Sequence, residues 1–378
     1  MATAADDQAY MAQAIALSLT HLGQTGTNPS VGCLIVSDGE IVGRGVTAIG
    51  GRPHAEQQAV AQAGNRAVGA TAYVTLEPCA HHGRTPPCAN ALVAAGIART
   101  VVAVADPDIR VSGRGLQILR DAGIQVETGV LAADARRALA FYLTRQTKNR
   151  PYVILKLAVS ADGMLGRTGE GQMAITGPEA RARVQRLRAE SDAILIGIGT
   201  ALADDPLLTV RTPDEADRSP IRIVLDTHLR LPLTAKLVQT AGQVPLIVVA
   251  DGLTEERAHA ASMSNAIGEI TARRDALTAA GAEVLEDGHL DTLLFGLATR
   301  GISSLLVEGG ANVAQSFLDA GLVDRIMLFE GGDTIGANGV VAPVTPDMIP
   351  QGFAHVHSEM FGTDRLDEYD RVETAAIV

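Results

Sequence analysis

Aromatic residues are scarce in this 378-residue chain, and long apolar runs are missing. Only 3% of the residues are aromatic and none is tryptophan. The 47% of residues that are hydrophobic therefore have to build cores from Ala, Val, Leu and Ile, which suits layers of helices and strands. No uninterrupted apolar run reaches the roughly 18 residues that a membrane-spanning helix needs. Residues Met1 to Asp7 also lack the positive region and apolar run of a secretory signal. We therefore expect a soluble, cytoplasmic protein.

Cysteine and basic residues are also few. The three cysteines are too few for a disulfide framework and fit a reducing compartment. One of them, Cys33, lies in an apolar run, where a buried free thiol is expected. The chain has 31 Lys and Arg against 43 Asp and Glu, which gives a net charge of −12. A nucleic-acid-binding protein usually carries a basic face, so a role in DNA or RNA editing is disfavoured.

Four residues of the first half carry the clearest chemical signal. His54, Cys79 and Cys88 are one imidazole and two thiols, the ligand types that Zn²⁺ prefers, and three protein ligands leave a fourth position open, as in catalytic zinc sites. Glu56 follows two residues after His54, where a carboxylate can transfer protons without binding the metal. His-x-Glu followed by Pro-Cys-x-x-Cys is typical of zinc nucleobase deaminases, although eight residues separate the cysteines here. The alternative is a core histidine with two idle cysteines.

A polar run divides the chain into two α/β patterns. The length of the chain favours two domains over one. Residues Arg145 to Pro151 are mostly polar and precede Tyr152–Val159, whose continuous apolar character is typical of a buried parallel strand. The run predicts a domain boundary at about Lys148, with domains of residues 1–147 and 148–378. Strands and helices alternate after it, which predicts a doubly wound α/β domain.

Two helices of the first half are predicted in some detail. Residues Ala55–Ala63 read as a helix that begins just after His54. Asp6 is a candidate cap for a helix of about residues 7–22. The segments that carry the candidate zinc ligands are both expected at helix starts. The positive end of the helix dipole stabilises thiolates there.

Two glycine-containing segments of the second half could hold phosphate. The stretch Gly197 to Leu202 begins like a dinucleotide fingerprint but lacks its third glycine. Glu308 to Asn312 lies between a predicted strand and a helix start, where free backbone amides bind pyrophosphate. The alternative for the glycine pair in this second segment is a tight turn.

The segment from Leu76 to Cys88, with its long spacing of cysteines, resembles the deaminase half of the bifunctional riboflavin-biosynthesis deaminase/reductase family. The resemblance continues at Asn28 to Gly32 and at Asp106 to Asp108. It extends to the reductase half of the family through Lys156 to Gly163, Gly199 to Arg211 and Val307 to Gly310. It implies an N-terminal cytidine-deaminase-like three-layer α/β/α domain and a C-terminal dihydrofolate-reductase-like α/β domain.

The resemblance also implies roles for individual residues. Glu56 would be the catalytic residue, and His54, Cys79 and Cys88 would bind one Zn²⁺ per chain. The deaminase substrate would be held by Asn28, His81, Arg84, Asp106 and Asp108. The reductase substrate would be held by Arg188, Leu208, Arg211 and Glu308. NADPH would be held by Ala158, Ala174, Thr200, Asp204, Thr227, Gly310, Ala311, Asn312, Val313, Ala314, Gln315 and Ser316. From polar composition alone, the segment of His81 and Arg84 also fits a solvated surface loop.

The expected activity is a pair of reactions on phosphorylated pyrimidines. The first is zinc-dependent hydrolytic deamination of a diaminopyrimidinone that carries a phosphoribosylamino group. The second is NADPH-dependent reduction of the ribosyl group of the product to ribityl. Small molecules are the expected partners, with neither nucleic acid nor membrane, and a homo-oligomer is left open. One alternative is a deaminase with an inactive reductase half, because the aromatic residue that the family has near Ala174 is missing. The other is a non-catalytic protein that binds zinc and nucleotide.

Overall fold

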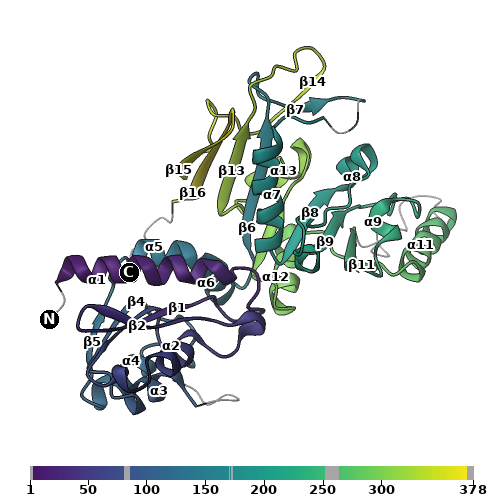
Figure 1. The fold of residues 1–378 in the computed structure, drawn as a ribbon. Coiled ribbons are helices and arrows are strands. Elements are labelled where there is room, and N and C mark those ends of the chain that lie inside the picture. The colour runs from purple at the N-terminus through teal and green to yellow at the C-terminus, as the bar shows by residue number, and fades with distance from the viewer. Residues whose placement is uncertain (1–2, 81–85, 170, 172, 252–263, 373–378) are drawn as a thin grey trace. The chain divides into compact units, whose positions relative to one another are not determined.

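The computed structural model describes residues 3–80, 86–169, 171, 173–251 and 264–372. Contacts divide the chain into two compact units, Met1–Arg150 and Pro151–Val378 (Figure 1). The division lies slightly after the position expected near Lys148. The last helix of the first unit ends at Lys148. The next residue, Asn149, has a positive φ of 52°, a left-handed conformation that is common just after the end of a helix.

The first unit is built on one five-stranded mixed sheet in the order β2-β1-β3-β4-β5. β1 is antiparallel to both β2 and β3, and β3, β4 and β5 are parallel to one another. The strands are β1 (Gly32–Ser37), β2 (Glu40–Val46), β3 (Thr71–Leu76), β4 (Arg99–Val104) and β5 (Gln125–Thr128).

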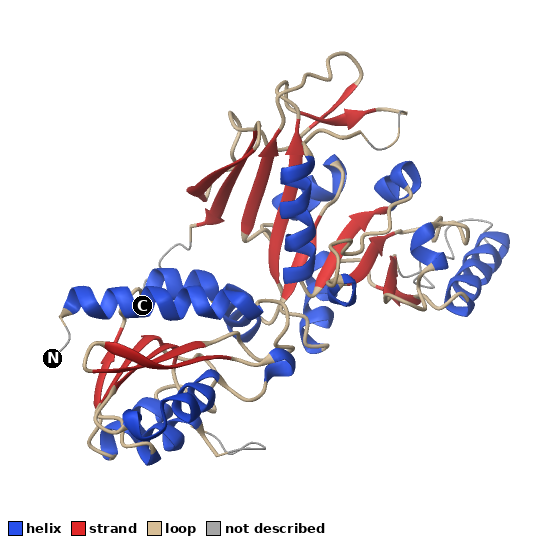
Figure 2. Ribbon diagram, in the orientation of Figure 1, coloured by secondary structure: helices blue, strands red, loops and turns tan. Residues whose placement is uncertain are grey.

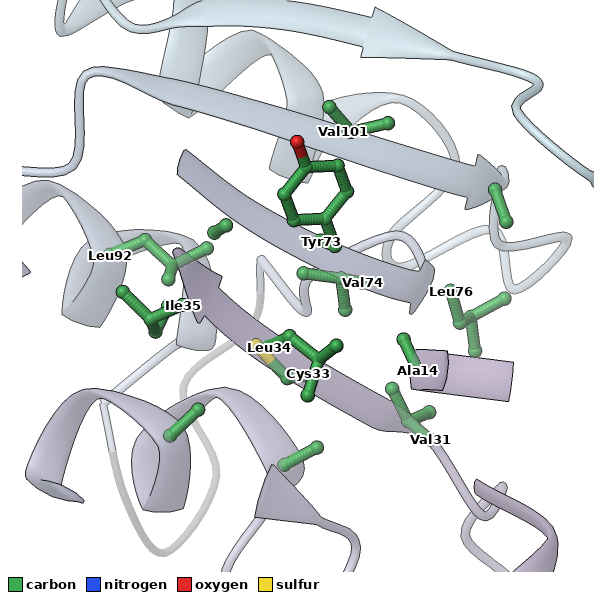
Figure 3. Packing of buried hydrophobic residues seen from close by; sticks show 14 of the residues in the cluster. Ala14, Val31, Cys33, Leu34, Ile35, Tyr73, Val74, Leu76, Leu92 and Val101 are labelled. Carbon is green, nitrogen blue, oxygen red and sulfur yellow. The ribbon is translucent and has the colours of Figure 1, made fainter. Parts of the chain in front are cut away.

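Helices cover both faces of this sheet, as the three-layer prediction requires. One face carries α1 (Ala4–Ser18), α5 (Ala132–Ala138) and α6 (Ala140–Lys148), and the other carries α2 (Ala55–Ala63), α3 (Cys88–Ala94) and α4 (Arg114–Asp121). Figure 2 shows the same layers by type of structure. The core between them is mainly aliphatic and includes Leu34, Ile35, Val74 and the fully buried Cys33 (Figure 3). The prediction of a buried free thiol at Cys33 is therefore confirmed.

The start of α1 differs from the prediction. Thr3, not Asp6, is the cap: its hydroxyl accepts the Asp6 amide, and the Asp6 carboxylate accepts the Thr3 amide in return. This reciprocal pair is a capping box, which needs an acceptor three residues inside the helix. The predicted cap lies about one helical turn after the observed cap. The helix therefore starts at Ala4 rather than near residue 7, and it ends at Ser18 rather than near residue 22.

The second unit contains a nine-stranded sheet in the order β11-β10-β9-β8-β12-β6-β13-β16-β15. The seven strands from β11 to β13 are parallel, and β16 and β15 are antiparallel. The strands are β6 (Tyr152–Val159), β8 (Ala193–Gly197), β9 (Ile221–Leu225), β10 (Leu246–Ala250), β11 (Glu283–Glu286), β12 (Ser304–Val307), β13 (Arg325–Glu330), β15 (Phe353–Phe361) and β16 (Asp364–Arg371). A separate two-stranded ribbon consists of β7 (Met164–Arg167) and β14 (Gly339–Val341).

Helices connect the parallel strands, as the alternating pattern predicts. They are α7 (Pro178–Glu190), α8 (Ile198–Asp204), α9 (Lys236–Gln239), α11 (Ser264–Ala279), α12 (Leu290–Thr299) and α13 (Ala311–Asp319). The hairpin of β15 and β16 was not predicted, because β15 is exposed along most of its length and lacks a clean apolar alternation. Among the helices that the structure describes, none combines the length and the apolar character needed to cross a bilayer.

Candidate active sites

The three predicted metal ligands lie together in the first unit. His54 immediately precedes α2, Cys79 lies in the loop after β3, and Cys88 is the first residue of α3. Their ligand atoms all lie within 4.8 Å of one another. His54 Nδ1 is 3.8 Å from Cys79 Sγ and 3.4 Å from Cys88 Sγ. Tetrahedral zinc with ordinary bond lengths would hold a nitrogen and a sulfur ligand about 3.6 Å apart, so the three atoms fit this ion.

The two thiols have opposite electrostatic environments. The Cys88 amide, at the start of α3, donates to Cys79 Sγ at 3.2 Å. The Cys88 thiol, with help from the His54 imidazole, lowers the pKa of Cys79 to about 4. The same contact with Cys79, together with burial, raises the pKa of Cys88. The His54 imidazole and the helix start at Cys88 thus both favour the thiolate form of Cys79.

Glu56 lies in the first turn of α2, and only 3% of its surface is exposed. Burial is the main cause that raises the pKa of Glu56 to about 7, and the neighbouring Cys79 adds to the shift. A carboxyl group with such a pKa both accepts and releases protons near neutral pH, which is the property a proton-transfer residue needs.

The predicted deaminase substrate residues are only partly described. Asn28 is half-buried, and its amide nitrogen approaches the backbone of Gly51, where a Cβ would meet it at 2.3 Å. Asp106 and Asp108 are buried in the loop after β4. Tyr142 donates its hydroxyl to Asp106 at 2.9 Å, and Arg110 forms an ion pair with Asp108. His81 and Arg84 lie outside the described residues.

The second unit has a partly buried charged cluster at the carboxyl end of its central strands. Glu308 directly follows β12 and accepts two hydrogen bonds of 2.9 Å from Arg188. Lys156, on the neighbouring strand β6, is half-buried. Its removal from water lowers its pKa, although Glu308 opposes the shift. The prediction from sequence missed Lys156. Its signal was a single charged residue within an otherwise apolar strand.

Arg188 and Arg211 differ in their partners within the protein, because Arg188 is paired with Glu308 whereas the Arg211 side chain is exposed. A further Arg188 nitrogen donates to the Thr209 carbonyl at 3.4 Å. The Arg188 guanidinium is therefore mainly engaged by Glu308 and by the loop that contains Thr209. Arg211 is exposed, and its backbone amide is held by Gln185. Leu208, between them, is buried with a positive φ of 56°. Of the two arginines, Arg211 is the better placed to meet a phosphate in solution.

Five of the twelve predicted cofactor residues lie at the starts of two helices, Thr200 in α8 and residues 310–313 at α13. The Gly310 amide donates to the Thr200 hydroxyl at 3.2 Å, which joins the start of α13 to the start of α8. A Cβ on Gly309 would lie 2.7 Å from Val313 Cβ, so this close approach requires glycine. The N-cap residue of α13 is Gly310, which has no side chain of its own to cap the helix. The free amides of this helix start fit a pyrophosphate.

The remaining cofactor candidates are more dispersed. Ala314 is fully buried in the core, and its amide is bonded to the Gly310 carbonyl, so it lies inside the helix rather than at a ligand-facing surface. Gln315 and Ser316 form contacts within α13. The others are Ala158 near the end of β6, the half-buried Asp204, and the exposed Thr227 and Ala174. Ala311, which is half-buried, and the exposed Asn312 are the first two residues of α13.

Family models match both halves of the chain. The cytidine and deoxycytidylate deaminase zinc-binding region matches residues 4–104, and the RibD C-terminal domain matches residues 151–366. The riboflavin biosynthesis protein RibD of Escherichia coli is 42% identical over 347 residues, which are 88% of this chain and 89% of that protein. The chain belongs to the RibD family of riboflavin-biosynthesis deaminase/reductases.

Solved structures of the family have the same fold. RibD of Acinetobacter baumannii superimposes with a TM-score of 0.84 at 36% identity, covering 98% of this chain and 100% of that one. A diaminohydroxyphosphoribosylaminopyrimidine deaminase/5-amino-6-(5-phosphoribosylamino)uracil reductase of Thermotoga maritima has a TM-score of 0.82 at 31% identity, covering 97% and 99%. The predicted family and fold class are thus confirmed. No feature of the described residues favours the alternative of an inactive reductase half.

Proposed function

We propose that the first unit deaminates a diaminopyrimidinone that carries a phosphoribosylamino group, and that the second unit reduces the ribosyl group of the product with NADPH. The observation that carries the proposal is the grouping of three ligand atoms within 4.8 Å beside a buried Glu56. Membership of the RibD family supports the second reaction. The free cysteines fit a reducing compartment, so we also infer a cytoplasmic enzyme.

In the deaminase unit, His54, Cys79 and Cys88 would hold one Zn²⁺. When bound, this ion supplies Lewis-acid activation of a water molecule. Glu56, whose pKa burial raises to about 7, accepts a proton from that water and passes it to the ring nitrogen. Glu56 then takes the second proton of the same water and delivers it to the departing amino group, which leaves as ammonia, and the water oxygen takes its place on the ring.

In the reductase unit, the hydride comes from the cofactor and the protein mainly positions the two reactants. The start of α13 would bind the pyrophosphate of NADPH, and Arg211 would bind the substrate phosphate. Reduction of the ribosyl carbon also needs a proton at the ribose oxygen that is released. Lys156, whose pKa is lowered by burial, is the residue that we propose for that transfer, and Glu308 beside it remains the ionised partner of Arg188.

The proposed function predicts two successive products. Incubation of the purified chain with the diaminopyrimidinone should give the aminouracil, with an amino group replaced by oxygen. Addition of NADPH should then give the ribityl product, which carries two more hydrogens. Mass spectrometry of both mixtures distinguishes the steps. Deamination without the second product would support the inactive-reductase alternative, and no change of mass would reject the enzyme assignment altogether.

NADPH should be preferred to NADH by at least about 10-fold in kcat/KM. The extra phosphate of NADPH would make at least one charge-assisted hydrogen bond, worth roughly 1.5–3 kcal/mol. The comparison is made in the second half-reaction alone, with the aminouracil supplied at a fixed concentration. Equal kcat/KM values with the two cofactors would reject the preference.

A further inference from the structure

Glu77 is a buried carboxylate for which the proposed chemistry has no direct use. It follows the last residue of β3 and precedes Pro78 and Cys79, and only 3% of its surface is exposed. Its own amide continues the pairing of β3 with β4 through a 2.9 Å bond to the Val104 carbonyl. The side chain therefore points from the end of the central strands into the protein beside the metal-binding loop.

Four backbone amides converge on this one carboxylate. Glu77 Oε2 accepts the amides of Asp106 and Gly113 at 3.3 and 3.0 Å. Glu77 Oε1 accepts those of Gly115 and Leu116 at 2.9 and 3.3 Å. All four donors are neutral and lie 29 to 39 positions further along the chain. An ionised carboxylate, which has two oxygens and only acceptor sites, is the side chain that satisfies such a set.

Two of these amides belong to the first turn of α4, which starts at Arg114 and has no capping side chain from its own N-cap residue, Gly113. Glu77 thus takes the place of the missing cap and complements the positive end of the helix. The helix start also lies directly against the metal loop. A Cβ on Gly115 would be 2.0 Å from the Pro78 carbonyl oxygen, so only glycine allows this approach.

The other two amides bracket the loop between β4 and α4. This loop carries Asp106 and Asp108, and its shape depends on internal contacts such as the 2.9 Å bond from the Asp108 amide to Asp106 Oδ1. Glu77 holds Asp106, the second residue of the loop, and Gly113, its last residue. The loop therefore has a defined distance from Cys79, since Glu77 is only two residues before that ligand.

We propose that Glu77 is a positioning residue that sets the substrate loop, residues 106–113, relative to the metal-binding Cys79. The proposal rests on the proposed deamination and on Asp106 and Asp108 as substrate contacts. Glu77 would hold the two parts of the deaminase site, the metal ligand Cys79 and the substrate loop, at a fixed distance from each other. Glu77 is not one of the three grouped metal ligands, and both of its oxygens are bonded to backbone amides. Its loss should therefore affect substrate binding more than the chemical step.

The variant Glu77→Gln tests this role, because glutamine has the same size but replaces one acceptor oxygen with a donor. Two of the four amides would then face a donor in a buried place, which is costly. We expect the KM for the diaminopyrimidinone to rise at least ~10-fold, while kcat at saturating substrate stays within ~3-fold and zinc stays at one per chain. The reductase half-reaction, measured on the same sample, should not change.

The matched control is Glu40→Gln, which removes a carboxylate of the same type from the same unit. Glu40 is exposed and contacts Arg66 only at the surface, so its loss should leave KM unchanged. If Glu77→Gln does not fold, Glu77→Asp takes its place: it keeps the charge but is one methylene too short to reach all four amides. A rise in KM is expected there too.

Two results would overturn the proposal. An unchanged KM in a folded variant would reduce Glu77 to a helix cap, with only the melting temperature lowered. Loss of zinc with an unchanged KM would show that Glu77 acts on the metal loop alone. Failure of the proposed deamination would look different, because the wild-type chain itself would then release no ammonia.

Discussion

Replacement of Glu56 by glutamine should lower ammonia release by at least ~10²-fold, the usual contribution of a positioned proton-transfer group. Glutamine keeps the size and hydrogen-bonding reach of glutamate but cannot take a proton from water and return it to the leaving amino group. Zinc should remain at one per chain, because Glu56 is not one of the three grouped ligands. Steady-state ammonia release and metal analysis on one sample measure both quantities.

Two controls separate lost catalysis from lost structure. Burial raises the pKa of Glu56 to about 7, above the ordinary value near 4.5. Because Glu56 ionises more easily in the unfolded chain than in the folded one, it lowers the free energy of unfolding at any pH above about 4.5. Glutamine does not ionise, so the melting temperature of Glu56→Gln at pH 8 should be equal to or higher than that of the wild type. Cys88→Ser should instead lose the metal, since it removes a ligand. Deamination near the wild-type rate in Glu56→Gln would remove Glu56 from the mechanism.

Loss of zinc should abolish deamination and leave reduction intact. The proposed metal ligands all lie in the unit Met1–Arg150, and the proposed NADPH residues all lie in Pro151–Val378. Treatment with a chelator, or Cys88→Ser, should therefore stop ammonia release, while oxidation of NADPH continues when the aminouracil is supplied. Both half-reactions are measured on each preparation.

Arg211→Ala should have the opposite effect. Loss of a charge-assisted contact to the substrate phosphate costs roughly 1.5–3 kcal/mol, or about 10- to 150-fold in the reduction step, and deamination should not change. Arg186→Ala is the matched control, because Arg186 lies on α7 of the same unit, is 70% exposed and pairs only with Glu190 among the described residues. If removal of zinc from a folded chain also stops reduction of the supplied aminouracil, a single composite site has to replace the two-site proposal.

Local sequence was enough to predict the elements whose causes are local. The helix Ala55–Ala63 and the strand Tyr152–Val159 have the predicted bounds, because apolar periodicity and an adjacent terminating residue define them. The N-terminal helix was misplaced by one turn, since both Thr3 and Asp6 are suitable caps and only the reciprocal bond between them decides which one starts the helix.

The sequence alone determined the candidate metal-ligating set of this protein, and its motifs were enough to show the resemblance to the family. Imidazole, thiol and carboxylate side chains have few other uses in that combination, so His54, Glu56, Cys79 and Cys88 could be selected without coordinates. The tertiary structure decided the partners of buried charges. Glu308 meets Arg188 across 120 positions, and Glu77 meets four amides more than 28 positions away. A buried charge is stabilised by whatever the fold brings to it, and no local pattern in the sequence records which distant groups those are.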